Sequence, residues 1–426
     1  MLRQYDEKRE QLPGSSLCHL DLTRRACPAS TSGTAISSQH WQPLQLVSMS
    51  HSSSLSCPGN EDWGDLELSD SSGSREFSLP DGRPLPFGAI VDRWRLVAKL
   101  GRGGFSFCYL AENRHNNKLP LTALKIGDVL SSQDQNDWSW INFCQEIQMF
   151  TRLSSTADGT PASCIPQIYA SGIVESAEGL RPWICMERLG EDLYCATWYT
   201  AKERHELEGL DRKAAKWPGR GFPEPQLLQY ATLMLRALQH VHKQQAAGQL
   251  SIKTLPLCVQ PANFCLPFKQ TRASTASQIF LIDFGLSHDV PAKESHQPFF
   301  GTPDYASSAC LHERQAFPKD DLESLVYTLT ELWNGELPWD LEADIGIKNR
   351  GGGSNGWTPQ QLLAMSSARN CQWDQLLLQD SMPRWLLWLH RYIKSLRCSD
   401  PISYEYCIMM LMAFQELEGS PLDPEE

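Results

Sequence analysis

The chain of 426 residues lacks any long uninterrupted apolar run. A membrane-spanning helix needs about 20 consecutive, mostly apolar residues, so no membrane insertion is expected. The first residues, MLRQYDEK, also lack the apolar core of a secretory signal peptide. An excess of positive charge is missing as well, because 38 Lys and Arg oppose 50 Asp and Glu, for a net charge of −12. This balance argues against a large nucleic-acid-binding surface, which requires clustered cations.

Paired cysteines are absent too. The 14 cysteines are scattered, with no CxxC pair and no Cys/His spacing typical of a metal site. Because no secretory signal is present, free thiols in a reducing compartment are a better expectation than disulfides. We therefore expect an intracellular protein, either cytoplasmic or nuclear.

The N-terminal residues 1–88 are rich in serine, proline and short polar runs. Such a segment buries too little apolar surface to offset the entropy of ordering the chain, so we expect a disordered tail. Trp63, Leu66 and Leu68 follow an acidic stretch within it. A short docking motif is therefore the alternative to a plain solvated tail.

Hydrophobic periodicity divides the rest of the chain into a β-rich part and a helical part. Strands are predicted at 94–99, 107–111 and 121–126, followed by an amphipathic helix at 138–153.

Beyond residue 187 the pattern becomes helical. One helix is predicted to open at Pro225, because proline costs little in a first turn. A second is predicted from an Asp320 N-cap to Gly335, and a last one from Pro383 to about residue 396. We therefore expect an α+β fold in which a small β-rich lobe precedes a larger helical lobe.

A glycine-rich stretch, GRGGFS at 101–106, lies between the first two predicted strands. Gly101 and Gly103 would let the backbone approach phosphate groups closely, and Phe105 could fold over them as a lid. Ser106 stands where a GxGxxG pattern has its last glycine. Taken alone, such a glycine-rich stretch is more often simply a hairpin turn.

A single lysine, Lys125, occupies an otherwise apolar strand. A buried cation needs a partner, and Glu146 on the following helix is the candidate. A Lys–Glu pair that orients the α- and β-phosphates of ATP is a feature of protein kinases.

The strongest motif is FLIDFGL at 280–286. Its apolar strand delivers the carboxylate of Asp283 to a tight Phe-Gly turn, which suits a magnesium ligand at the β- and γ-phosphates. Asn263, twenty residues earlier, is the expected second metal ligand. The glycine-rich turn, Lys125, Asn263 and Asp283 follow one another in the order of the protein-kinase motif set.

Further motifs carry a more specific resemblance. The sequence has GTPDYAS at 301–307, DDLESL at 320–325, LPW at 337–339, MERLG at 186–190 and YIKSLR at 392–397. Together, over roughly residues 93–414, the chain resembles the casein kinase 1 group of protein kinases.

That resemblance implies a bilobal protein-kinase fold that uses ATP and Mg²⁺. It implies an N-lobe at 93–187, a C-lobe at 188–414 and an acidic tail at 415–426. The hinge would contain Met186 as gatekeeper, followed by Glu187.

By the same resemblance, seven positions would form the cofactor site: Gly101, Gly103, Phe105, Lys125, Glu146, Met186 and Glu187. Asn263 and Asp283 would hold the metal. Asp321 would brace the catalytic loop from below.

The catalytic loop departs from the group. When residues 261–264 are aligned with its PxNF run, Cys258 stands where the catalytic aspartate belongs and Gln260 where the loop lysine belongs. A thiol with a pKa of about 8.5 is mostly protonated at neutral pH, and loss of a general base typically costs on the order of 10²–10⁴ in rate. A gene-model error over residues 243–257 is the alternative explanation.

The substrate side departs as well. Members of the group prefer acidic or phosphorylated substrates, and a basic residue in their GTxRYAS run helps to bind them. This chain has Asp304 at that position. A carboxylate at that position is expected to repel an acidic substrate.

The sequence therefore predicts a pseudokinase that binds Mg²⁺ and ATP and acts on a protein partner as a scaffold or allosteric regulator. Two alternatives remain open. One is an active serine/threonine kinase that transfers the γ-phosphate of ATP to protein hydroxyls. The other is an interaction module that no longer binds ATP.

Overall fold

The computed structural model describes most of the chain from residue 84 onward, and all of these residues belong to one unit, Ser53–Glu426. The predicted tail up to residue 83 lies outside the described residues, as do Phe105 and Cys258. The described ranges are 84–103, 106–116, 118–129, 138–154, 162–176, 179–208, 221–246, 259–268, 277–285, 299, 301–314, 316–341, 357–378, 382–398 and 400–419.

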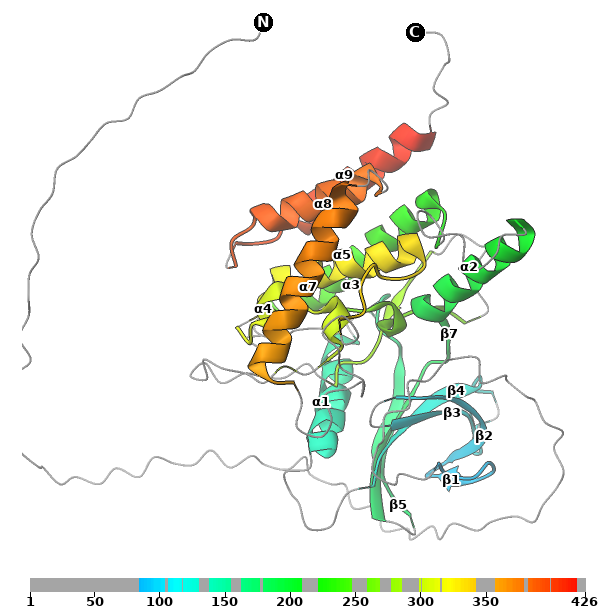
Figure 1. The fold of residues 1–426 in the computed structure, drawn as a ribbon. Coiled ribbons are helices and arrows are strands. Elements are labelled where there is room, and N and C mark those ends of the chain that lie inside the picture. Colours follow the sequence, from blue (N-terminus) through cyan, green and yellow to red (C-terminus); the bar gives the residue numbers. More distant parts are fainter. Residues whose placement is uncertain are drawn as a thin grey trace, which may run out of the picture. The chain divides into compact units, whose positions relative to one another are not determined.

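The first part of the described chain forms an antiparallel sheet with the strand order β1–β2–β3–β4–β6–β5 (Figure 1). Its strands are β1 (Ile90–Val91), β2 (Trp94–Arg102), β3 (Ser106–Asn113), β4 (Thr122–Gly127), β5 (Ile168–Ser176) and β6 (Gly179–Met186). The helix α1 (Trp138–Leu153) follows β4 and contacts β4, β5 and β6.

The strands predicted from alternation correspond to β2, β3 and β4, and the predicted helix to α1. The sheet nevertheless begins before the predicted domain boundary at Arg93. Val91 of β1 is fully buried beside Trp94 and Leu96 of β2, in a core that fills one face of the sheet. Two residues of β1 are too few for a readable alternation, which is why the pattern missed them.

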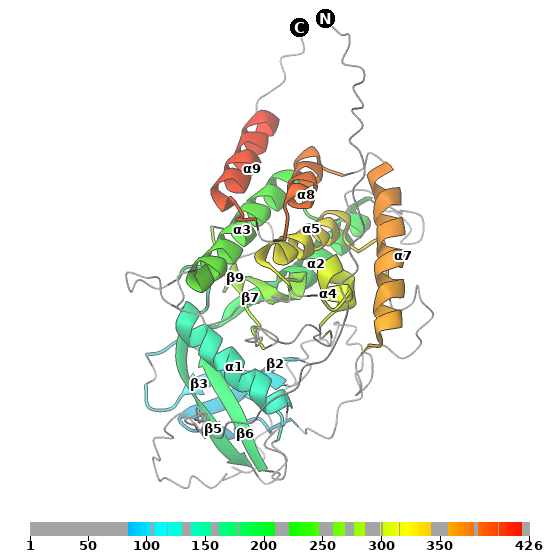
Figure 2. The same ribbon diagram turned by 90° about the vertical axis from the view of Figure 1, so that its left-hand side faces the viewer.

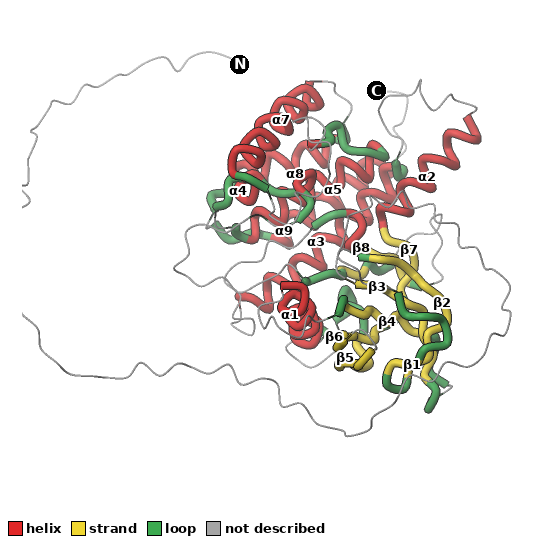
Figure 3. Tube along the Cα trace, turned by 60° about the horizontal axis from the view of Figure 1, so that its bottom comes forward, coloured by secondary structure: helices red, strands yellow, loops and turns green. Residues whose placement is uncertain are grey.

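The second part is mainly helical, and Figures 2 and 3 show its helices gathered apart from the six-stranded sheet. A small sheet β7–β8–β9 lies in this part. The elements are β7 (Leu189–Asp192), α2 (Leu193–Glu208), α3 (Glu224–Ala246), the 3-10 turn η1 (Pro261–Asn263), β8 (Phe264–Pro267), β9 (Phe280–Leu281), the 3-10 turn η2 (Pro303–Tyr305), α4 (Ser308–Leu311), α5 (Pro318–Asn334), α7 (Pro359–Leu378), α8 (Arg384–Ser395) and α9 (Tyr404–Gly419).

The predicted N-cap of α5 is wrong. The helix begins at Pro318 with Phe317 as the N-cap, and Asp320 is the third helical residue. Its carboxylate accepts the backbone N–H of Phe317 at 2.7 Å. From the third helical position the carboxylate accepts the N–H of the N-cap residue, whereas an N-cap aspartate would accept an N–H two or three residues further on. The predicted C-terminus is confirmed, because Gly335 ends α5 in the left-handed conformation with φ at 84°.

The helix predicted from Pro383 is confirmed as α8, but it is not the last one. Helix α9 follows and runs to Gly419, past the predicted domain end at Phe414. Residues 406–414 of α9 are all apolar, so they show no periodicity for a pattern to detect.

Gly221 leads into α3 through a close backbone approach to α5. Its N–H donates to the carbonyl of Trp333 at 2.9 Å, and a Cβ atom there would stand 1.8 Å from the carbonyl oxygen of Leu332. Because both neighbours are helix backbone, we expect Gly221→Ala to lower the free energy of unfolding by about 1–3 kcal/mol. Urea denaturation measures the change. Gly101→Ala is the matched control, since a Cβ at Gly101 meets no atom within 4 Å; equal effects of the two substitutions would contradict the prediction.

Candidate functional site

Lys125 and Glu146 form the predicted pair. Lys125 of β4 donates to both carboxylate oxygens of Glu146 on α1, each at 2.7 Å. The Glu146 side chain is 4% exposed and the Lys125 side chain 20% exposed. A bidentate contact in such a shielded place holds the ammonium in one position.

A second carboxylate stands near the same ammonium. The Oδ1 atom of Asp283 lies 3.8 Å from Nζ of Lys125. Burial alone would lower the pKa of Lys125, but the Glu146 and Asp283 carboxylates outweigh it, so this pKa lies above its ordinary value. Burial raises the pKa of Glu146, against the opposing effect of Lys125. With both of its oxygens 2.7 Å from Nζ, we take the pair as ionised.

Asp283 occupies an unusual backbone conformation. Its φ is 64°, in the left-handed region that most side chains avoid and that Asp and Asn tolerate best. The carboxylate accepts the N–H of Gly285 at 3.3 Å and remains 44% exposed. The turn therefore presents this side chain beside Lys125 while leaving part of it accessible.

Phe284 ties this turn to α1. Its ring is fully buried and meets the ring of Phe150 edge-on, with the centroids 5.1 Å apart. Phe150 lies one helical turn after Glu146, so one face of α1 contacts both Lys125 and the Asp283 turn. The i, i+4 spacing of these two residues is the sequence signal that could have identified Phe150.

Asn263 lies directly beside the Asp283 strand. Its carbonyl accepts the N–H of Ile282 at 2.9 Å, and its neighbour Phe264 pairs with Leu281. The two predicted metal ligands are therefore brought together by the β8–β9 pairing. An amide and a carboxylate oxygen are ligands that Mg²⁺ accepts alongside phosphate and water, so these residues fit the ion that the resemblance implies.

Among the described residues, no group of three or more His, Cys, Asp and Glu side chains could hold a metal by itself. A divalent ion at Asn263 and Asp283 would depend on oxygen atoms from a bound phosphate or water, as is usual for Mg²⁺.

The described end of the catalytic loop is anchored to α5. The hydroxyl of Thr328 donates to the carbonyl of buried Val259 at 3.0 Å. Gln260 then caps the turn η1, and its carbonyl accepts the N–H of Asn263 at 3.0 Å. The contact of Thr328 was not predicted from the sequence, because no sequence pattern identifies which hydroxyl on a helix will be buried.

The described residues on either side of the glycine-rich turn join β2 to β3. Gly103 donates its N–H to the carbonyl of Ser106 at 2.8 Å, and Gly101 pairs with Cys108 across the two strands. The φ of Gly101 lies outside the left-handed region, and no atom stands within 4 Å of its missing Cβ. Neither backbone strain nor packing within the described chain therefore requires a glycine here, which is consistent with room kept for a ligand.

Cys108 was not singled out from the sequence. It pairs with Lys125 across β3 and β4, so the two side chains point to the same face of the sheet. Burial raises the pKa of this thiol to about 11, which keeps it neutral at physiological pH. Alternation within β3 could have placed it on this face.

The predicted hinge joins β6 to β7. Met186 ends β6, is 8% exposed and pairs with Ala123 of β4. Glu187 exchanges two hydrogen bonds with Gln167: its N–H donates to the Gln167 carbonyl at 2.8 Å, and its carboxylate accepts the Gln167 N–H at 3.2 Å. The Glu187 side chain is thus engaged in holding the end of β6 to the start of β5.

Asp304 does not act as the sequence suggested. It is 6% exposed, and its carboxylate accepts the N–H of Leu341 at 3.0 Å. Its carbonyl accepts the indole N–H of Trp339, also at 3.0 Å. The carboxylate is therefore turned inward to satisfy the backbone near residue 341, and it is not exposed in the way that the expected repulsion of acidic substrates requires.

Asp321 belongs to a buried network. Its Oδ2 atom lies 2.8 Å from Nε2 of His242 on α3, and Nδ1 of that ring lies 2.5 Å from the hydroxyl of Tyr404 on α9. Because a carboxylate can only accept, Nε2 of His242 carries the proton of this contact. Asp321 thus links three helices of the C-terminal part. Residues 251–258, which include the first part of the catalytic loop, lie outside the described residues, and the predicted contact of Asp321 with this loop stays a prediction.

The structure thus brings Lys125, Glu146, Asn263 and Asp283 together. Met186 lies on β6, which adjoins the Lys125 strand, and Gly101 lies on β2, with β3 between β2 and the Lys125 strand. Nothing is described for Phe105 and Cys258. One cation, one accessible carboxylate and a neighbouring amide can position a phosphate–metal complex, and electrostatic positioning is most of what phosphoryl transfer requires.

No family model matches the chain. Similarity to curated proteins is low but extensive. The human serine/threonine-protein kinase VRK2 is 24% identical over 325 residues, which cover 72% of this chain and 57% of the relative. The Caenorhabditis elegans serine/threonine-protein kinase nekl-2 is 23% identical, covering 59% of this chain and 60% of the relative. Casein kinase I homolog 2 of Schizosaccharomyces pombe is 24% identical, covering 58% and 48%.

The chain spans about half the length of the curated relatives it matches. Two of these relatives are named serine/threonine-protein kinases and the third a casein kinase I homolog, and their similarity supports a protein kinase domain in this chain. The α+β fold class expected from the sequence, with its β-rich sheet and helical part, is confirmed and agrees with a kinase fold.

Proposed function

We propose that the chain is a casein kinase 1-like kinase domain that binds Mg²⁺ and ATP and is impaired in phosphoryl transfer. The observation that carries the binding half is the placement of Lys125 against both Glu146 and Asp283. This cation and its two carboxylates would hold phosphate groups and a bridging ion in a fixed orientation. When bound, Mg²⁺ would neutralise charge on the β- and γ-phosphates.

The impairment rests on sequence. Cys258 and Gln260 leave the loop without a carboxylate and a cation, while the supports around it, Thr328 and Asn263, are in place. A domain of this kind would act through a protein partner, as a scaffold or an allosteric regulator. The alternative is a serine/threonine kinase that uses another base.

We also propose an intracellular location. All ten cysteines among the described residues are free, in keeping with a reducing compartment. None of the described helices is long and apolar enough to cross a membrane.

Thermal unfolding with Mg²⁺ and ATP tests the binding half. At about 100 times the dissociation constant, the nucleotide is expected to stabilise the natural chain by about 2.7 kcal/mol, seen as a rise of the melting temperature. Asp283→Asn should abolish most of this rise. Asparagine is the suitable replacement, because it tolerates the left-handed backbone at φ 64° and removes only the charge.

The transfer of labelled phosphate from ATP to casein and to the chain itself tests whether phosphoryl transfer is impaired. Stabilisation without transfer above the Asp283→Asn level supports the proposal. Stabilisation with transfer supports the active kinase instead. If ATP neither stabilises the chain nor donates phosphate, both are wrong and the domain is an interaction module.

A further inference from the structure

Two histidines near the end of α3 contact different parts of the molecule. His240 and His242 are two residues apart, which places them about half a helical turn from each other. His242 contacts Asp321 of α5 and Tyr404 of α9. The Nε2 atom of His240 instead lies 2.9 Å from the carbonyl oxygen of Leu153, the last residue of α1. Because a carbonyl can only accept, Nε2 of His240 donates this hydrogen bond.

This bond satisfies a carbonyl at the end of α1. The last four carbonyls of a helix have no partner within it. Those of Phe150 and Thr151 accept from the N–H and the hydroxyl of Ser154. Leu153 is fully buried, so its carbonyl is shielded from water and takes its donor from His240. A histidine N–H at this place also points toward the negative end of the helix dipole, which is favourable.

Helix α3 is a rigid support for this contact. Its residues Tyr230, Met234, Leu238 and Val241 are fully buried in the main core, and the helix contacts α5, α9 and β9. Helix α1, by contrast, lies against β4, β5 and β6 of the six-stranded sheet. The bond from His240 therefore ties a helix of the sheet part to the core of the helical part.

The tied end of α1 lies close to the contact between Glu146 and Lys125. Glu146 precedes Leu153 by seven residues, which is about 10 Å along the helix axis. A helix moves as one body over two turns, so a shift of its end also shifts the Glu146 carboxylate. The two 2.7 Å hydrogen bonds from Nζ of Lys125 require both carboxylate oxygens in place.

We propose that His240 is a positioning residue of the candidate nucleotide site, which holds the C-terminal end of α1 and thereby keeps Glu146 on Lys125. This inference rests on the proposed function, in which Lys125 holds the phosphates of ATP. His240 touches no nucleotide and acts through α1 alone. Without its hydrogen bond, fewer molecules hold α1 in place, and the apparent affinity for nucleotide falls in proportion to the fraction that does.

Replacing His240 by leucine and by glutamine tests the proposal. The amide nitrogen of glutamine can donate as Nε2 does, whereas leucine fills the space without a donor. Titration calorimetry is expected to show that His240→Leu weakens the binding of Mg²⁺ and ATP about tenfold. Without nucleotide, amide exchange in α1 should be faster on the order of tenfold. His240→Gln should bring both values back near those of the natural chain.

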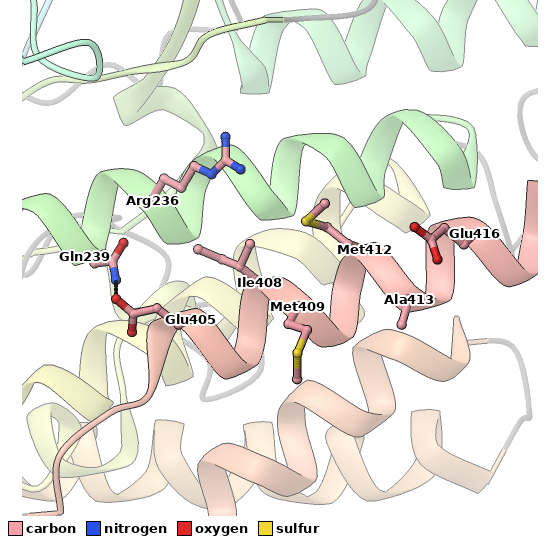
Figure 4. Close-up of a pocket in the computed structure, with 8 residues that line it drawn as sticks. All are labelled: Arg236, Gln239, Glu405, Ile408, Met409, Met412, Ala413 and Glu416. Carbon is pink, nitrogen blue, oxygen red and sulfur yellow. Dashed lines mark hydrogen bonds between the residues drawn. The ribbon is translucent and has the colours of Figure 1, made fainter.

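Gln239→Leu is the matched control. Gln239 precedes His240 on α3 and donates to Glu405 of α9 at 2.7 Å, at the pocket between these two helices (Figure 4). The substitution removes a side-chain hydrogen bond from the same turn and introduces the same residue. It should leave both the ATP affinity and the exchange in α1 unchanged, and equal melting temperatures show that the variants retain the fold.

Three results would overturn the proposal. One is unchanged exchange or unchanged ATP affinity after His240→Leu. Another is an equal loss for His240→Gln, because the donor would then be irrelevant. The third is an equal loss for Gln239→Leu, which would indicate general loosening of α3. Exchange is measured without nucleotide, so a natural chain that fails to bind ATP contradicts the proposed function, while exchange in α1 still decides whether His240 holds this helix.

Discussion

A chain carrying Cys258→Asp together with Gln260→Lys is expected to transfer phosphate to protein substrates on the order of 10²–10⁴ times faster than the natural chain. The aspartate restores a group that positions the substrate hydroxyl and takes its proton, and the lysine restores a cation near the transferred phosphoryl group. One such electrostatic contact contributes about 3 kcal/mol to the transition state. Steady-state transfer of labelled phosphate to casein measures the gain.

The surroundings of Gln260 favour this repair. Its backbone carbonyl holds the turn before Asn263, and its side chain makes no capping hydrogen bond there. A lysine can therefore replace it while the turn is retained. The single substitutions Cys258→Asp and Gln260→Lys separate the two contributions. Adding Asp283→Asn to the repaired chain should return the rate to background; a repaired chain no faster than the natural one would show that more than these two residues is missing.

Removing the carboxylate of Asp321 is expected to cost about 1.5–3 kcal/mol of unfolding free energy. Asp321 is 1% exposed and His242 7% exposed, so both side chains are buried. Asp321→Ala removes the carboxylate that accepts from Nε2 of His242 and leaves this buried N–H without that acceptor. The ring also orients the Tyr404 hydroxyl, so the loss reaches three helices at once. The urea midpoint, or the melting temperature, measures the effect.

Asp321→Asn is the matched control, because its amide oxygen still accepts from Nε2 and only the charge is lost. Tyr404→Phe removes the outer hydroxyl alone and should cost about 0.5–1.5 kcal/mol. The expected order of destabilisation is therefore Asp321→Ala, then Asp321→Asn and Tyr404→Phe. A loss for Asp321→Ala no larger than that for Tyr404→Phe would contradict the role of the network.

Local spacing was sufficient to predict the elements that carry the candidate site. Alternation identified β2, β3 and β4, and helical periodicity identified α1. A lysine within an apolar strand required a partner, and the first carboxylate on the next helix supplied it. The contact between Asn263 and the Asp283 turn follows from the pairing of β8 and β9. The apolar strand that became β9 was predicted, whereas β8 was not.

Prediction failed where a side chain could serve two purposes. Asp304 is polar and lies in a substrate-facing motif of the resembled group, yet its carboxylate satisfies a buried N–H of Leu341. An aspartate can cap a helix from the N-cap position or from the third helical position. Asp320 takes the third position, because α5 begins at Pro318 and the Phe317 N–H donates to its carboxylate. Helix α9 failed for the opposite reason, because a uniformly apolar run has no face to detect.

Helix α1 has a consequence for regulation. Glu146 and Phe150, one turn apart, contact Lys125 and Phe284, so this one helix supports both the Lys125 strand and the Asp283 turn of the candidate nucleotide site. A protein that binds and displaces α1 is therefore expected to change the affinity of the site for nucleotide. By thermodynamic linkage, nucleotide then changes the affinity for that protein by the same factor. A domain that never transfers phosphate can in this way still report the supply of ATP to its partner.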